Sequence, residues 1–258
     1  MPRAADFAFL QHDGPLPFAH RGGASEVPEN TMPAFEHAVR LGYTYLETDV
    51  HVTADGVLVA FHDDVLDRVT DRAGRIDELP WSVVREAKVD GREPIPLFED
   101  LLGAFPEARI NIDPKHDASV EPLVRVLRRA GAVERVCIGA FSDRRLARIR
   151  TLLGPTLCTS LGPQGIAKLV AVATARTRVG TLAAPCAQVP VAARGITIVD
   201  ERFVTAAHRR GMQVHVWTID DEAEMRRLLD LGVDGIMTDV PVVLKAVLED
   251  RGQWTSPS

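Results

Sequence analysis

The amino-acid sequence predicts an α/β protein, a (β/α)8 TIM-like barrel with a small insertion after the second strand. Short apolar runs alternate along the chain with amphipathic segments that end at a glycine. Several of these runs show little alternation of polar and apolar residues, which is typical of parallel strands covered on both faces. The length of 258 residues also fits this fold, which takes about 250 residues.

Eight apolar runs are predicted strands. In chain order they are Pro17–Ala19, Tyr43–Val50, Arg109–Asp113, Val136–Phe141, Leu157–Leu161, Val189–Ala192, Gln213–Ile219 and Gly235–Thr238. Eight strands that alternate with helices favour a closed parallel barrel over an open sheet. Residues 163–187 show the least regular pattern, so the sixth repeat has the weakest definition in the sequence.

Five amphipathic segments are predicted helices, and each ends at a glycine. They are Thr31–Leu41, Glu121–Ala130, Asp143–Leu153, Glu201–Arg210 and Asp221–Leu231. A glycine just past the last turn supplies the left-handed residue that closes a helix. Ser142 and Asp220 stand at expected N-cap positions, because their side-chain oxygens can accept hydrogen bonds from free backbone N–H groups.

One apolar run, Val57–Phe61, does not fit the alternation. It follows the second strand through Ala54-Asp55-Gly56, and Asp-Gly between apolar runs is a hairpin signal. We therefore expect an antiparallel partner for the second strand and an insertion over about residues 54–96. No linker or low-complexity segment divides the chain, so one domain is expected over residues 1–258, with its core at about 17–248.

Composition excludes several classes of partner. The chain has 36 acidic residues against 30 Lys and Arg, a net charge of -6, whereas nucleic-acid clamps usually present a basic face. No run approaches the roughly 20 apolar residues that span a bilayer, and residues 1–15 lack a signal-peptide pattern. Three widely spaced cysteines imply no disulfide framework. We expect a cytoplasmic protein without nucleic-acid partner or stable membrane anchor.

Acidic residues stand inside the apolar runs. Glu47 and Asp49 are two apart in the second strand, so both carboxylates project from the same face, and Asp113 ends the third strand. In a barrel, side chains at the C-terminal strand ends converge on one mouth. Buried carboxylates repel one another, and a hard divalent cation such as Ca²⁺ or Mg²⁺ relieves that repulsion because it prefers oxygen ligands.

Basic residues end the same strands. His20 and Arg21 follow the first strand, His62 ends the hairpin partner, and Lys115 shares a face with Asp113. Imidazole titrates near neutral pH, so the two histidines are candidate proton carriers. Arg21 and Lys115 supply positive charge for a phosphate group, and an arginine can bind two oxygens at once.

Together these residues resemble the glycerophosphodiester phosphodiesterase family. The similar motifs are His20-Arg21-Gly22, Pro28-Glu29-Asn30-Thr31, Glu47-Thr48-Asp49-Val50, His62-Asp63, Asp113-Pro114-Lys115, Val216-Trp217-Thr218 and Gly235-Ile236-Met237-Thr238-Asp239-Val240-Pro241. The order and spacing of these motifs, from about residue 17 to 245, make the resemblance specific.

The resemblance implies a role for each candidate residue. His20 and His62 would be the acid/base histidines, and Glu47, Asp49 and Asp113 would be metal ligands for Ca²⁺ or Mg²⁺, with Mn²⁺ as an alternative ion. Arg21 and Lys115 would hold the phosphate. Trp217 would line the substrate pocket or, alternatively, fill the top of the barrel as a structural aromatic residue. Asp239 would fix the last loop without reacting. The third metal ligand is usually Glu in the family, and Asp113 is one methylene shorter.

The predicted reaction is hydrolysis of a small glycerophosphodiester to glycerol 3-phosphate and an alcohol. Two alternatives share the same fold. A phospholipase-D-like enzyme acting on lysophospholipids would need an apolar groove or lid, for which the sequence gives no signal. A catalytically inactive binding protein would lack a site histidine or ligand, and none is missing. The oligomeric state has no signature in the sequence.

Overall fold

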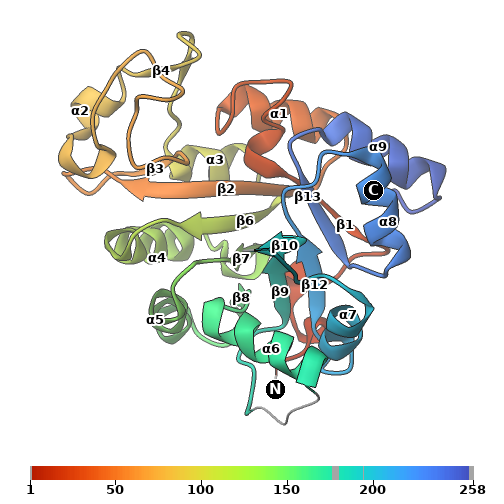
Figure 1. Ribbon diagram of the computed structural model, residues 1–258. Coiled ribbons are helices and arrows are strands. Elements are labelled where there is room, and N and C mark those ends of the chain that lie inside the picture. Colours follow the sequence, from red (N-terminus) through yellow and green to blue (C-terminus); the bar gives the residue numbers. More distant parts are fainter. Residues whose placement is uncertain (1, 176–179, 194, 256–258) are drawn as a thin grey trace.

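Eight parallel strands form a nearly closed barrel in the computed structural model, which describes residues 2–175, 180–193 and 195–255. The hydrogen-bonded order is β8-β7-β6-β2-β1-β13-β12-β9, and helices surround the strands (Figure 1). The predicted α/β barrel is confirmed. The order of the strands also fixes where the polar strand ends meet.

The strands are β1 (Leu16–Ala19), β2 (Tyr45–Val52), β3 (Leu58–Ala60), β4 (Lys88–Val89), β5 (Glu93–Pro94), β6 (Arg109–Pro114), β7 (Val136–Ile138), β8 (Cys158–Thr159), β9 (Cys186–Val189), β10 (Ala192–Ala193), β11 (Ile196–Thr197), β12 (Gln213–Val216) and β13 (Gly235–Thr238). The α-helices are α1 (Met32–Arg40), α2 (Trp81–Val84), α3 (Phe98–Ala104), α4 (Val120–Arg129), α5 (Asp143–Leu153), α6 (Pro163–Ala175), α7 (Glu201–His208), α8 (Glu222–Asp230) and α9 (Pro241–Asp250). Short 3-10 helices cover Ala4–Asp6, Ala8–Leu10, His20–Gly22, Ile76–Glu78, Asp117–Ser119 and Val133–Arg135.

The N-terminal segment fills the end of the barrel where the strands begin. Phe9 stacks with Phe18 at 6.3 Å between ring centroids and packs edge-on against Tyr45 at 5.4 Å. The Tyr45 hydroxyl donates a hydrogen bond to the Phe9 carbonyl at 2.9 Å. These aromatic rings form one buried cluster with Cys137 and the other two cysteines, all of which are free thiols. The barrel interior is therefore a packed core below the mouth.

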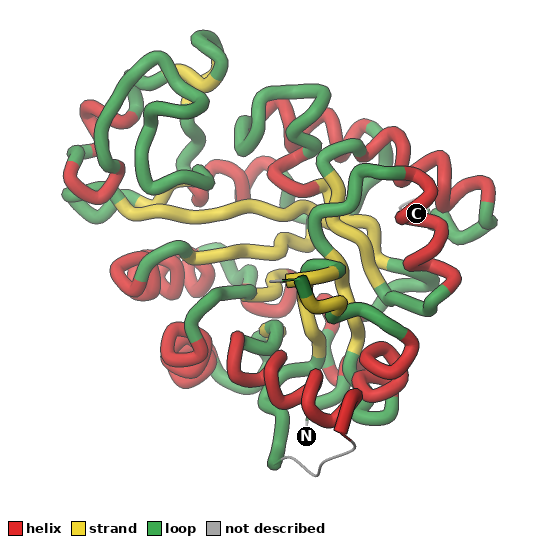
Figure 2. The backbone as a smooth tube through the Cα atoms, in the orientation of Figure 1, coloured by secondary structure: helices red, strands yellow, loops and turns green. Residues whose placement is uncertain are grey.

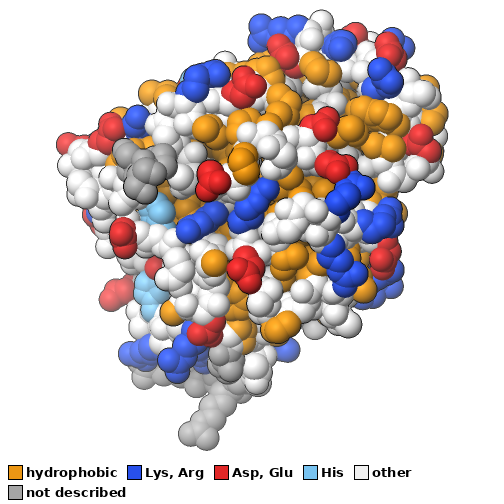
Figure 3. All heavy atoms as spheres, turned by 180° about the vertical axis from the view of Figure 1, so that it is seen from behind, with side chains coloured by type: hydrophobic (Ala, Val, Ile, Leu, Met, Phe, Trp, Pro, Cys, Tyr) orange, Lys and Arg blue, Asp and Glu red, His pale blue; other side chains and the backbone are white. Residues whose placement is uncertain are grey.

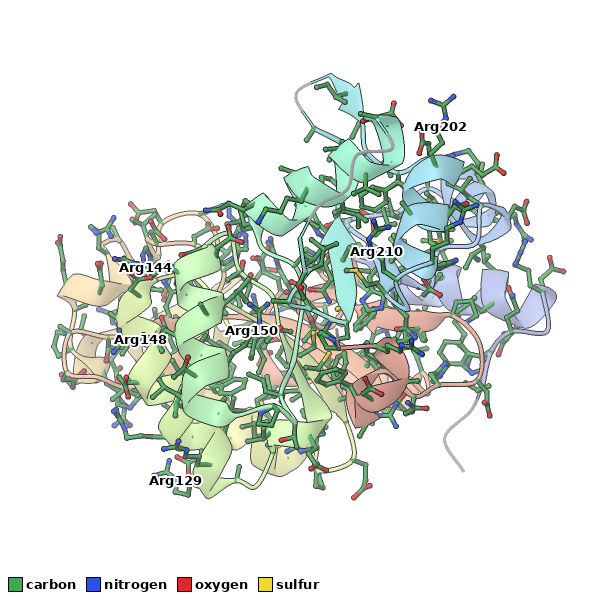
Figure 4. All side chains as sticks on the ribbon, turned by 90° about the horizontal axis from the view of Figure 1, so that it is seen from below. Arg129, Arg144, Arg148, Arg150, Arg202 and Arg210 are labelled. Atoms are coloured by element: carbon green, nitrogen blue, oxygen red, sulfur yellow. The ribbon has the colours of Figure 1, made fainter. Side chains whose placement is uncertain are left out.

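The seam between β8 and β9 closes the barrel with a single parallel bridge, Ser160 to Cys186. Arg150 reinforces it from α5: its Nε donates to Thr159 Oγ1 at 2.8 Å and its second nitrogen donates to the Ser160 carbonyl at 3.0 Å. Figure 4 shows Arg150 on the barrel side of α5, whereas Arg144 and Arg148 lie away from the strands. Arg150 thus ties α5 to the short strand β8 and provides a hydrogen bond to the Ser160 carbonyl at the bridge.

The insertion after β2 stands beside the barrel (Figures 1 and 2). As predicted, β3 pairs antiparallel with β2, with Val50 opposite Ala60. The insertion has its own small apolar cluster, which includes Phe61, Leu66 and Ile76. It continues through α2, β4 and β5 and returns to the barrel near Leu97, which bridges to Val59. Its position carries the segment after β3 to the barrel mouth.

Two local predictions were wrong. The sixth strand covers Cys186–Val189, three residues earlier than expected, because Pro190 has no N–H to continue the ladder. Asp220 is not the N-cap of α8; Asp221 fills that position and accepts from the Glu224 N–H at 2.8 Å. Ser142 caps α5 as predicted. The other barrel strands overlap the predicted runs, and α6 occupies the part of residues 163–187 that lacked a clear pattern.

The described surface carries charges of both signs. Figure 3 shows Lys and Arg interspersed with Asp and Glu on one face. Among the described residues, every helix is too short or too polar to cross a bilayer.

Candidate active site

The C-terminal strand ends bring the predicted site residues to the barrel mouth. Within the β2–β6 ladder, Asp49 is the direct Cα partner of Asp113, and Glu47 is the partner of Asn111. Residues paired in this way project to the same side of the sheet, so the acidic side chains of the two strands converge. Glu47 and Asp49 are both buried.

A tight turn after β1 carries His20 and Arg21 over the carboxylates. Arg21 adopts a φ of 51°, and its backbone N–H donates to Glu47 Oε2 at 3.1 Å. A β-carbon on Gly22 would lie 2.7 Å from the β-carbon of Ala34, so only glycine lets α1 approach this closely. The packing of α1 therefore fixes the turn that holds both basic residues.

Lys115 lies between two of the three acids. Its ammonium is 2.6 Å from Asp49 Oδ1 and 2.8 Å from Asp113 Oδ2. Burial disfavours the charge of Asp49, but Lys115, with help from His62 and Arg21, outweighs burial and lowers the pKa of Asp49. Burial also lowers the pKa of the Lys115 ammonium, but the two carboxylates outweigh it and raise that pKa above its ordinary value. The lysine is a fixed positive charge here.

Among the described residues, Glu47 forms an ion pair with neither a lysine nor an arginine, and its partner is His20, whose Nε2 lies 3.8 Å from Oε2. Burial, and then the charge of Asp49, raise the pKa of Glu47 to about 7. Burial raises the pKa of Asp113 as well, although Lys115 opposes that shift. The mouth therefore holds more negative charge than its lysine neutralises.

The two histidines share one arrangement. His20 Nδ1 lies 2.7 Å from Asp239 Oδ1, and His62 Nδ1 lies 2.5 Å from Asp63 Oδ1. Because a carboxylate accepts, each Nδ1 carries the proton, and each Nε2 remains available to exchange one. His20 Nε2 lies 3.8 Å from Glu47 Oε2. Burial disfavours the imidazolium of His20, but Glu47 and then Asp239 outweigh burial and raise the pKa of His20.

A second layer of ion pairs joins the two sides of the mouth. Arg21 contacts Glu29 Oε1 at 3.0 Å, and Arg68 of the insertion contacts both Glu29 and Asp63. Burial opposes the charge of Asp63, but the hydrogen bonds from Arg68 and His62 outweigh it and lower the pKa of Asp63 to about 2. The network therefore keeps the partner of His62 ionised and ties His62 to Arg21.

Arg21 retains one unused donor. Its Nε is buried and, in the described part of the chain, has no hydrogen-bond partner, although Asp49 Oδ2 lies 3.5 Å away. A buried donor without a partner is costly, so this nitrogen is suited to an oxygen of a bound anion.

A comparison with known proteins identifies the family. The model of the glycerophosphoryl diester phosphodiesterase family matches residues 20–243. A Mycobacterium tuberculosis protein named probable glycerophosphodiester phosphodiesterase 2 is 41% identical over 255 residues, which are 95% of this chain and 95% of that protein. The chain belongs to the glycerophosphoryl diester phosphodiesterase family.

Other similar proteins also match this chain over most of its length. A lysophospholipase D of Rattus norvegicus is 28% identical over 90% of this chain and 85% of its own. A Silicibacter pomeroyi protein of known structure superposes with a TM-score of 0.81 at 24% identity over 96% of this chain and 100% of its own. An Oleispira antarctica phosphodiesterase, solved with the product sn-glycerol-3-phosphate, has a TM-score of 0.77 at 22% identity over 92% and 97% of the two chains. These structures share the barrel.

Seven of the eight residues predicted for the phosphodiesterase site lie together at the mouth: His20, Arg21, Glu47, Asp49, His62, Asp113 and Lys115. Trp217 follows β12, and its ring meets Phe141, 5.9 Å away between centroids, edge to face. Phe141 was predicted at the end of a strand but follows β7 as a 73% exposed side chain. Trp217 also packs, partly buried, against the aromatic and cysteine cluster of the barrel interior, as expected of an aromatic residue that fills the barrel top.

Three further residues orient the site, and sequence patterns did not predict the contacts that they make. Asp239 was expected to fix the last loop, yet it also binds His20. Asp220 accepts from the Asp239 backbone N–H at 2.8 Å and so supports that contact. Asn30, at a φ of 55°, donates to Asp49 Oδ2 at 3.3 Å. Asn30 lies in the Pro28-Glu29-Asn30-Thr31 motif of the family. Asparagine adopts the left-handed conformation more readily than most residues, so an asparagine in this motif was the available signal.

The donor set fits a divalent cation. Carboxylate oxygens are the ligands that Ca²⁺ and Mg²⁺ take. Burial and the charge of Asp49 raise the pKa of Glu47, and a cation bound to these oxygens would oppose both effects. Asp49 and Asp113, which share the Lys115 ammonium, already hold a cationic group between their oxygens. Glu47, Asp49 and Asp113 would hold the ion.

Replacing Glu47 by Gln should stabilise the chelator-treated protein at high pH. The pKa of Glu47 is about 7 in the fold against an ordinary 4.5, so its ionisation costs stability. The cost is absent below the ordinary pKa, grows as the pH rises toward the folded value and reaches about 3 kcal/mol above it. Urea unfolding of Glu47→Gln and the native protein at pH 4 and pH 8 measures this difference.

Asp49→Asn is the matched control, because the pKa of Asp49 is lowered and not raised. This variant should be less stable than the native protein at pH 8, since it loses the charge that Lys115 contacts. If Glu47→Gln changed the free energy of unfolding equally at both pH values, ionisation of Glu47 would not destabilise the fold, and the prediction would be wrong.

Proposed function

We propose that the protein hydrolyses glycerophosphodiesters to glycerol 3-phosphate and an alcohol, with a divalent cation at Glu47, Asp49 and Asp113. The observation that carries the proposal is the matched pair of histidines beside these acids. His20 and His62 each have Nδ1 anchored on a carboxylate and Nε2 free. Membership of the phosphodiesterase family supports the same reaction.

The phosphate would bind where positive charge faces the acids. Arg21 offers its buried Nε, which has no hydrogen-bond partner among the described residues, and Lys115 offers a permanently charged ammonium. Ca²⁺ or Mg²⁺ bound to the carboxylates would neutralise phosphate charge and lower the pKa of the attacking hydroxyl. Without substrate, Lys115 stays between Asp49 and Asp113 and limits their repulsion.

Proton transfer would use the two free Nε2 atoms. One histidine removes the proton of the nucleophile, and the other protonates the departing alkoxide. Asp239 and Asp63 hold the imidazoles in the required tautomer and stabilise each imidazolium as it forms. His20 has a pKa raised by Glu47 and Asp239, which suits it to begin the cycle as the acid. His62 would then begin as the base.

The nucleophile would be the 2-hydroxyl of the substrate glycerol. This group lies next to the phosphorylated carbon, so its attack avoids the entropy cost of ordering a separate water, an advantage of roughly 7–11 kcal/mol in well-oriented cases. The product of the first step is a five-membered cyclic phosphate and a free alcohol. Water then opens the ring while His20 and His62 exchange roles.

The test is release of glycerol 3-phosphate from glycerophosphodiesters of several alcohols and from a lysophospholipid, with and without chelator. His20→Ala and His62→Ala should each lower kcat by roughly 10²–10⁴-fold, the usual contribution of a positioned proton carrier. His37→Ala is the control, because His37, on α1, pairs with Glu26 and its replacement should leave kcat unchanged. Near-native turnover by either site variant would remove that histidine from the mechanism.

A substrate whose glycerol 2-hydroxyl is replaced by hydrogen distinguishes the two routes of attack. Intramolecular attack predicts that this compound binds as a competitive inhibitor and releases no alcohol, because the nucleophile is missing. Alcohol release and inhibition constants for the deoxy and native substrates are the measurements. Comparable hydrolysis of both compounds would establish direct attack by water.

A further inference from the structure

A second group of ligand-type side chains lies beside the proposed catalytic site. One donor atom from each of His51, Asp64 and His116 lies within 4.8 Å of the other two. His51 belongs to β2, Asp64 follows β3 and His116 follows β6. The imidazole rings are 5.3 Å apart between centroids. None of these three residues takes part in the phosphodiester chemistry proposed above.

His51 has one ring nitrogen committed and one free. Its Nε2 lies 3.0 Å from the backbone carbonyl of His62, and a carbonyl only accepts, so Nε2 carries the proton. The lone pair of the neutral ring is therefore on Nδ1. Metal-binding histidines usually show this pattern, in which the second nitrogen donates to a backbone carbonyl and fixes the orientation of the ring.

Asp64 and His116 already form a close donor pair. His116 Nε2 lies 2.9 Å from Asp64 Oδ1. Two ligands of a tetrahedral zinc ion are about 3.3 Å apart, so a cation could replace the shared proton with a shift of a few tenths of an ångström. The nearest competitor for Asp64 is Arg75 at 4.0 Å, but Arg75 bonds more closely with Asp77 at 3.0 Å.

A route from solvent exists for this group. Half of the Asp64 side chain is exposed and His116 is partly exposed, whereas His51 is buried. The other group of three potential ligands found in the described part of the chain, Cys137 with Cys158 and Cys186, is fully buried within the barrel core. Access and a fixed ring orientation therefore favour the histidine group as a metal site.

We propose that His51, Asp64 and His116 bind a transition-metal dication such as Zn²⁺ or Co²⁺, separately from the cation at the three acids. Two imidazoles with one carboxylate suit zinc-like ions, whereas carboxylates alone suit Ca²⁺ or Mg²⁺. Three protein ligands leave a further position for water. Because His51 also holds the His62 backbone, the bound ion would fix the segment from His62 to Asp64 against β2 and β6.

The experiment uses Co²⁺ as the probe in the presence of excess Ca²⁺, which would compete for the proposed carboxylate site but competes poorly for imidazole ligands. The native protein should bind one equivalent of Co²⁺ and show the visible absorption bands of imidazole ligation. His116→Ala and Asp64→Asn should each weaken Co²⁺ binding by roughly tenfold or more. Binding by equilibrium dialysis and visible spectra are the readouts, and circular dichroism verifies that each variant is folded.

His208→Ala is the matched control, because His208 also pairs with an aspartate, Asp234, at 2.8 Å on a partly exposed surface. It should bind Co²⁺ as the native protein does. The proposal is overturned if the native protein binds no Co²⁺ under excess Ca²⁺. It is also overturned if both His116→Ala and Asp64→Asn bind normally, or if His208→Ala loses binding equally. Phosphodiesterase turnover is not a readout, so failure of the proposed function would leave this test unchanged.

Discussion

Burial of like charge at the barrel mouth is the constraint on which the site depends. Glu47, Asp49 and Asp113 project from adjacent strands. Glu47 and Asp49 are buried, and buried carboxylates repel one another strongly. One ammonium, that of Lys115, contacts two of the three acids. Burial, and then the charge of Asp49, raise the pKa of Glu47. This arrangement supports the proposed binding of a divalent cation at the three acids.

The surrounding structure keeps the acids and histidines in place. The turn after β1 brings the Arg21 N–H to Glu47, and the close contact of α1 at Gly22 fixes that turn. Asp239 and Asp63 each leave one imidazole nitrogen free for proton exchange. The insertion supplies Arg68, which keeps Asp63 ionised. The hairpin insertion is thus part of the proposed catalytic arrangement.

Local sequence patterns predicted the barrel because each β/α repeat carries its own signals. Gly235–Thr238 was bounded correctly, since an apolar run follows a helix-ending glycine. The strand near Val189 was misplaced because Pro190 interrupts an otherwise apolar stretch. The sequence did not predict that the N-terminal segment fills the end of the barrel, because Phe9 lies in a short 3-10 helix that has no helical or strand periodicity. Its role appears only in the tertiary structure, through the contacts of Phe9 with Phe18 and Tyr45.

The candidate site was partly predictable for a similar reason. Glu47 and Asp49 share a face by spacing alone, so their convergence follows from the strand. Asp63, the partner of His62, is its neighbour in the sequence, but the partner of His20 does not follow from spacing, because Asp239 is 219 residues away. Likewise, Arg68 reaches Glu29 across 39 residues through the fold of the insertion. Long-range pairs of this kind depend on tertiary structure, and no short motif specifies them.

The most direct test of the charge constraint is a crystal structure of the protein with Mn²⁺ and glycerol 3-phosphate, examined by anomalous scattering at the manganese edge. The charge balance predicts a manganese peak in contact with Glu47, Asp49 and Asp113, with the Lys115 ammonium moved from between the two aspartates toward the phosphate. A fully occupied product site without manganese at these carboxylates, and with Lys115 still between Asp49 and Asp113, would contradict the metal-dependent site.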